Sequence, residues 1–223
     1  MGFLDDLKRQ ADALREQQDQ DGTSLQRNTA AAEAACKTAL RYLSTLSAQL
    51  ETLRPTSPAR FRLDRKHCFE GLKLTDFYVD ARRRLQPDGE QFDHILMHWQ
   101  LKTGQKLVLV KDFISEIEQL ESRLRQSGAD THHETVRHPD TGKLIEMRYT
   151  VNADFRGSVR ITPKHETGRL QFLLQNLDGF ETISFELPAG ELGDARLDEL
   201  ARWLAGHPHG FLKGAEQLRR VEA

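Results

Sequence analysis

Hydrophobic residues recur with helical spacing over the first quarter of the chain. Within residues 3–17 one apolar stripe repeats every three or four residues, at Phe3, Leu4, Leu7, Ala11 and Leu14. The polar segment 17–22 interrupts this stripe. From Thr23, a capping residue, a second stripe repeats every seven residues, at Leu25, Ala32, Ala39, Leu46 and Leu53. The pattern predicts two helices that pair as a hairpin and end at the prolines that follow.

Two interpretations of this helical arm, residues 1–54, stay open. In one, the hairpin packs on the rest of the chain. In the other, it is an exposed coiled coil that binds a second copy or a partner protein. The candidate partner-binding residues are leucines in the second half of the longer helix: Leu43, Leu46 and Leu50. The arm is then expected to be separable, because the later segments carry apolar faces of their own.

Beyond the arm, apolar and polar residues alternate as they do in strands, first over residues 60–111 and again further along the chain. Asp178-Gly179 is a strong hairpin signal, and a two-residue turn there pairs Phe172 with Phe185. A change of phase near Thr75-Asp76 predicts a β-bulge.

Two further hairpins follow from the phase of the alternation. A turn after the first run of strands would pair Trp99 with Val108. A three-residue loop, Asn152-Ala153-Asp154, would keep both flanking apolar sets on one face and place Glu146 opposite Arg160. These registers predict that neighbouring strands in the sequence are also neighbours in the sheet.

Two shorter helices complete the pattern. One spans residues 111–126 and ends at Gly128, and the other spans Asp194 to Ala205 and ends at Gly206. Each has one apolar stripe and follows a run of strands, so each can cover one face of a sheet.

The predicted fold class is therefore α+β, with an N-terminal helical hairpin or coiled-coil arm followed by two antiparallel β-meander blocks, each followed by a helix. The expected divisions are 1–54 for the arm, 55–128 for the first block and 129–223 for the second. We expect the two blocks to form one compact body.

Composition narrows the class of protein. The net charge is −2, with 38% hydrophobic and 30% charged residues, and no segment has the strong basic excess typical of nucleic-acid binding. No apolar run is long enough to cross a bilayer, so no membrane role is expected. The two cysteines lack metal-site spacing and fit a reducing compartment, which favours a cytoplasmic location.

Candidate chemistry is sparse. His94 and His98 share a strand face about 13 Å apart, too far to chelate one ion. Neighbouring His67 and Cys68 would point to opposite faces of a strand, and His132, His133 and His138 flank a turn where they would be solvated. The sequence predicts no catalytic residue, no cofactor and no metal site.

Arginines are the most suggestive polar group. The candidate anion-binding residues lie on predicted strand ends and faces: Arg82, Arg83, Arg84, Arg148 and Arg156. Aromatic residues that could stack on bases are missing from those faces. The sequence therefore favours a non-enzymatic interaction or assembly protein that acts through its helical arm. The alternative is a module that binds an anionic ligand or, less favoured, nucleic acid through these arginines.

Overall fold

The computed structural model describes residues 3–86 and 89–223, and for residues 3–21 it describes the backbone only. The helices are α1 (Phe3–Leu53), α2 (Ile114–Ser127) and α3 (Asp194–Leu204), with a short 3₁₀ helix η1 (Ala189–Glu191) before α3. The strands are β1 (Phe61–Arg62), β2 (Cys68–Phe69), β3 (Leu74–Gln86), β4 (Gly89–Leu101), β5 (Lys106–Lys111), β6 (Asp130–Arg137), β7 (Leu144–Asn152), β8 (Phe155–Lys164), β9 (Arg169–Gln175), β10 (Glu181–Pro188) and β11 (Glu216–Glu222). The α+β class and the antiparallel strand pairing are as predicted.

One continuous helix takes the place of the predicted helical hairpin. α1 runs for 51 residues, which corresponds to a rod of about 77 Å. The polar segment 17–22 does not break it, because its glutamines favour helix and a single exposed glycine, Gly22, costs only about 1 kcal/mol. Polarity ended the apolar stripe there, but not the helix.

The strands form one large sheet and one small sheet, and these mix the two predicted blocks. The large sheet has the order β11-β10-β9-β8-β4-β3, the small sheet has the order β5-β7-β6, and β1 pairs with β2. Both sheets join a strand from before residue 128 to strands from after it: β4 pairs with β8, and β5 pairs with β7. The β-meander prediction therefore fits broadly, since β8, β9, β10 and β11 follow one another across the large sheet, but the strands do not divide into two successive blocks.

Local signals were the reliable ones. The hairpin at Asp178-Gly179 pairs Phe172 with Phe185, as predicted, and their rings stack 4.9 Å apart. The β3–β4 register shifts after Thr75, where Asp76 has a φ of 56°, so the bulge is confirmed as well.

The two other hairpins are crossovers between the sheets. Trp99 pairs with Gly157 and not with Val108, and Arg160 lies opposite Leu96 and Leu173 instead of Glu146. The chain leaves the large sheet between β4 and β5 and returns to it between β7 and β8. The two connecting loops are hydrogen-bonded to each other, because Asp154 Oδ1 accepts from the main-chain N–H groups of Thr103 and Gly104 at 2.8 and 3.0 Å.

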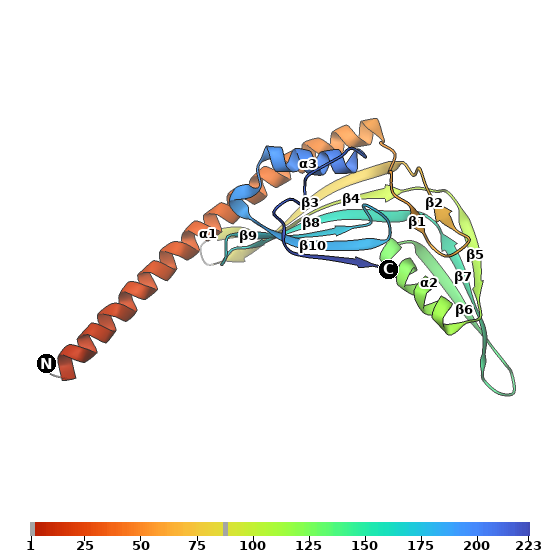
Figure 1. The fold of residues 1–223 in the computed structure, drawn as a ribbon, viewed down its shortest axis with the longest axis horizontal. Helices are drawn as coiled ribbons and strands as arrows, with labels where there is room; N and C mark the ends of the chain where they lie inside the picture. The colour runs from red at the N-terminus through yellow and green to blue at the C-terminus, as the bar shows by residue number, and fades with distance from the viewer. Residues whose placement is uncertain (1–2, 87–88) are drawn as a thin grey trace.

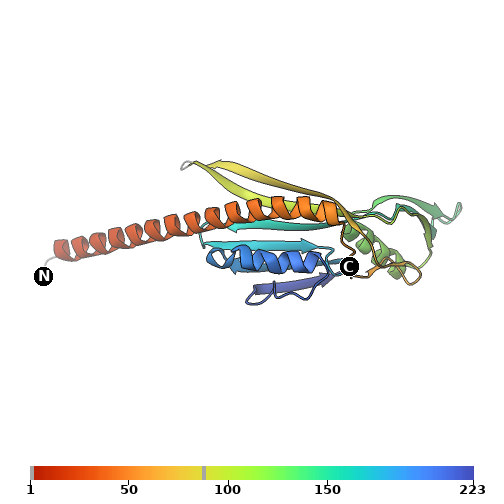
Figure 2. The ribbon, with the colours of Figure 1, turned by 90° about the horizontal axis from the view of Figure 1, so that it is seen from above.

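Two helices cover one face of the large sheet. The second half of α1 and all of α3 lie side by side on it (Figures 1 and 2). Arg41 of α1 forms an ion pair of 2.7 Å with Asp194 of α3, and Tyr42 donates a hydrogen bond to Asp198. α2 packs near the small sheet and ends at Gly128 in the left-handed conformation, as predicted. None of the helices within the described residues has both the length and the apolar composition of a bilayer-spanning helix.

Candidate functional site

The first half of α1 extends beyond the body of the protein (Figures 1 and 2). The helix reaches the body at Asn28, whose Nδ2 donates to the carbonyl of Glu166 at 2.8 Å in the turn between β8 and β9. The side chains of residues 22–27 are all exposed, including Leu25, which is 46% exposed. Residues 3–27 of α1 therefore project from the body, and we call this segment the projecting arm.

The predicted partner-binding leucines do not belong to this arm. Leu43 and Leu50 are buried in the core, and Leu46 is packed against it and partly buried. Because their apolar surface is already covered by the chain's own sheet, they are not available to a partner in this fold. The alanines that precede them explain the close contact, since Ala32 and Ala39 are fully buried and leave room for the helix to approach the sheet.

Polar contacts fix α1 on the sheet. Glu33 Oε1 accepts hydrogen bonds from the main-chain N–H of Phe92, at 2.8 Å, and from His165 Nε2, at 2.9 Å. Further along, Glu51 Oε2 accepts from the N–H of Phe77 at 3.1 Å, close to the β-bulge. The glutamates occupy backbone donors of β3 and β4, so the direction of the arm is set by bonds as well as by packing.

The five candidate anion-binding arginines are dispersed. Arg84 pairs with Asp93, and the guanidinium of Arg83 lies 4.5 Å above the ring of Phe92. Arg82 lies opposite His94 on β4.

The remaining two arginines lie elsewhere. Arg156 is opposite Gln100, six residues from His94 along β4, which corresponds to about 20 Å. Arg148 is on the small sheet, 2.6 Å from its neighbour Glu146. The fold does not gather the five guanidinium groups around one groove.

The cysteines and histidines form no metal centre in the part of the chain that the structure describes, where no group of three or more His, Cys, Asp or Glu side chains could hold an ion. Cys36 is buried, and burial raises the pKa of its thiol to about 12, which keeps it protonated and unreactive. Cys68 is exposed.

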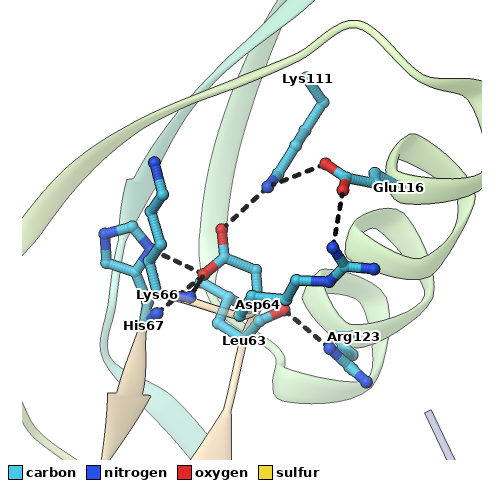
Figure 3. A network of polar contacts seen from close by, with 8 residues as sticks. Leu63, Asp64, Lys66, His67, Lys111, Glu116 and Arg123 are labelled. Atoms are coloured by element: carbon cyan, nitrogen blue, oxygen red, sulfur yellow. Dashed lines mark hydrogen bonds and ion pairs between the residues drawn. The ribbon is translucent and has the colours of Figure 1, made fainter.

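A network of polar contacts joins the β1–β2 turn to β5 and α2 (Figure 3). Asp64 Oδ1 accepts from the main-chain N–H groups of Lys66 and His67 and lies against His67 Nδ1, each at 2.8 Å. Asp64 Oδ2 lies 3.1 Å from Lys111 Nζ, which also reaches Glu116 Oε2 at 3.5 Å. This network was not predicted from the sequence, although an acidic residue before a turn is a signal for a side chain that accepts hydrogen bonds from the backbone that follows.

The electrostatics of Asp64 indicate a structural role. Burial alone would raise the pKa of its carboxyl group, but the hydrogen bonds from His67, the Lys66 N–H and Lys111 outweigh burial and hold the pKa well below its usual range. Both oxygens are occupied, so the carboxylate is not free to take a proton from a substrate. These contacts link the β1–β2 turn to the small sheet and to α2.

Replacing Asp64 by Asn should destabilise the protein by about 3 kcal/mol at neutral pH, because it leaves the poorly exposed Lys111 ammonium without its closest counter-ion. The folded-state pKa of Asp64 is lowered, so its contribution is fully present above the unfolded value, about 3.9. It is lost progressively as pH falls from there through the folded-state pKa. Urea denaturation at several pH values checks this.

The matched control is Asp140→Asn, a change of the same chemistry in the exposed turn between β6 and β7. This variant should keep wild-type stability and the wild-type pH dependence. If Asp64→Asn lost stability equally at pH 7 and pH 3, or not at all, the ion pair would not be the source of the effect.

Comparison with known proteins adds no precedent: no protein family, curated protein or solved structure matches the chain.

Proposed function

We propose that this chain is a non-enzymatic interaction or assembly protein that binds another protein chain through its projecting arm. The observation that carries the proposal is the division of α1, whose second half is buried on the sheet while its first half extends away from the body. A helix without tertiary contacts gains little stability from its own sequence, so a long projecting helix points to a partner.

The apolar spacing supports this proposal. Leu4, Ala11 and Leu25 belong to the same seven-residue series as Ala39, which is buried on the body, with Gln18 as a polar member between them. The same series thus faces the sheet at Ala32 and Ala39, and it continues in the sequence of the projecting arm. Apolar positions at seven-residue spacing are those that pack against a second helix.

The test compares two double variants of equal charge change. Leu7→Glu with Leu14→Glu places charges on the apolar stripe, and Ala13→Glu with Gln20→Glu places them off it. Sedimentation of the full chain should show a self-associated wild type, a monomeric stripe variant and an unaffected control. Losing two buried leucines should weaken association at least about 100-fold.

A negative sedimentation result would change the expected partner, and a negative cross-linking result would overturn the proposal. A wild type that sediments as a monomer at every concentration would exclude self-association and leave a different protein as the partner. In that case, cross-linking in cells should give an adduct that the stripe variant loses and the control keeps. An adduct unchanged in the stripe variant would overturn the arm as the binding element.

The alternative, a module for an anionic ligand or nucleic acid built on the five arginines, is favoured by no observation. Three of them, Arg83, Arg84 and Arg148, already have carboxylate partners, and Arg148 lies on a different sheet from the other two.

A further inference from the structure

A polar cavity of about 310 Å³ is lined in part by Arg123, which also belongs to the network of Figure 3. Four elements that are distant in the sequence form its wall: β1, α2, the β9–β10 turn and the end of β11. The turn is pressed against β1, since a side chain at Gly179, where φ is 132°, would meet the carbonyl oxygen of Arg60 at 3.1 Å. The cavity is therefore bounded by backbone whose position is fixed.

One wall is positively charged. Arg60 and Arg62 share one side of β1, with the buried Phe61 between them, and Arg123 approaches from α2. Arg60 has Glu70 at 3.0 Å as its partner, and Arg123 donates to main-chain oxygens, including that of Ala223 at 3.1 Å. Within the described residues the guanidinium of Arg62 makes no hydrogen bond or ion pair.

The opposite wall is acidic. Glu181 and Glu222 are directly opposite each other in the β10–β11 ladder. The side chain of Glu181 is only 6% exposed; its Oε2 lies 3.4 Å from Arg220, and its Oε1 has no hydrogen-bond partner. Burial raises the pKa of Glu181, against the opposing effect of Arg220, and the charges of Asp178 and Glu222, which also line the cavity, raise it further. The carboxylate of Glu222 forms no ion pair within the described residues.

Positively and negatively charged side chains thus line the same cavity without forming ion pairs with one another. Arg62 and Glu222 both border the space, yet they do not form an ion pair with each other. The geometry points to a binding site for a small zwitterion, a molecule with a carboxylate for Arg62 and an ammonium group for Glu222 and Glu181. The volume is at the lower end of the range for small-molecule sites, which suits a free amino acid or a dipeptide. This site is independent of the arm and of the partner proposed for it.

The experiment titrates the full chain with two probes, L-alanine and L-alanyl-L-alanine, at millimolar concentration, with binding followed by amide NMR shifts. N-acetyl-L-alanine and L-alaninamide each carry only one of the two charges and are the ligand controls. The protein variants are Arg62→Gln and Glu222→Gln, with Arg219→Gln, outside the cavity, as the control. All three positions are exposed, so the variants should fold.

We expect changes in amide NMR shifts, confined to residues of the cavity wall, for at least one probe. The probe that binds more tightly shows whether the site prefers an amino acid or a dipeptide. Arg62→Gln and Glu222→Gln should each weaken binding about tenfold, the effect of losing one charged contact, while Arg219→Gln should not. The proposal is overturned if neither probe causes shifts, if a one-charge control binds as tightly as its parent, or if Arg62→Gln binds like the wild type. Since sedimentation is not used, failure here leaves the arm proposal untouched.

Discussion

Removing residues 1–54 should unfold the protein, whereas removing residues 1–24 should leave its body intact. The second half of α1 buries an apolar stripe on the large sheet: Ala32, Ala35, Cys36, Ala39, Leu43 and Leu50. Loss of a single buried leucine costs about 2–5 kcal/mol, and a whole domain is stable by only about 5–15 kcal/mol. Without the stripe, the sheet face under α1 is open to water, and the chain 55–223 should not keep a cooperative fold.

Near-UV circular dichroism and urea denaturation of three chains check this: the full chain, 25–223 and 55–223. The chain 25–223 is the control, because it keeps every α1 residue that is buried among the described side chains and loses only part of the projecting arm. Wild-type cooperativity in 55–223 would mean that the helix is not part of the core. It would also restore the separable arm that the sequence alone suggested, with its boundary at residue 54.

Sequence patterns predicted what is decided locally. The Asp178-Gly179 hairpin, the bulge at Thr75-Asp76 and the glycine end of α2 depend on a few adjacent residues and on backbone conformations that few other residues adopt. The apolar stripe of α3 was found too, although Trp203 was missed as a buried member. Periodicity says which face of an element is buried, and here it did so correctly.

Sheet topology was not predictable in the same way. Alternation shows that Met147, Tyr149 and Val151 share a face, but it does not say which strand lies beside them. A loop short enough for a hairpin is also short enough for a strand to pass from one sheet into the next, and loop 152–154 does the latter. The strand β11 was not predicted, because all its residues are exposed and it shows no alternation of buried and exposed positions.

Prediction of the candidate sites was limited in the same way, because local sequence patterns do not show which distant segments meet. The seven-residue spacing of apolar residues in α1 does not distinguish a stripe that packs on the chain's own sheet from one that binds a partner. Leu43 and Leu50, predicted as partner-binding residues, are buried on the sheet. The cavity near Arg62 needs four segments that only the tertiary fold brings together. Single residues of that cavity were visible in the sequence as charged strand positions, and their convergence was not.

Replacing Gly157 by Ala should destabilise the protein by about 3 kcal/mol, the upper end of the usual cost of overpacking a core. Gly157 lies opposite Trp99 across β8 and β4, and a Cβ built on it falls far inside van der Waals contact of the indole atoms Cε2, Cζ2 and Nε1. Trp99 is almost fully buried and cannot move aside without displacing its neighbours. Urea denaturation, with tryptophan fluorescence as a local probe, measures the effect.

The control is Gly190→Ala, where an added Cβ meets nothing within 4 Å, and it should be close to neutral in its effect on stability. In a Trp99→Leu background the cost of Gly157→Ala should shrink, because the clashing ring is gone. A Gly157→Ala variant as stable as the wild type, with unchanged fluorescence, would mean that β8 does not lie beside β4 in this register. The arrangement of the large sheet, which supports α1 and the crossover to the small sheet, would then be wrong.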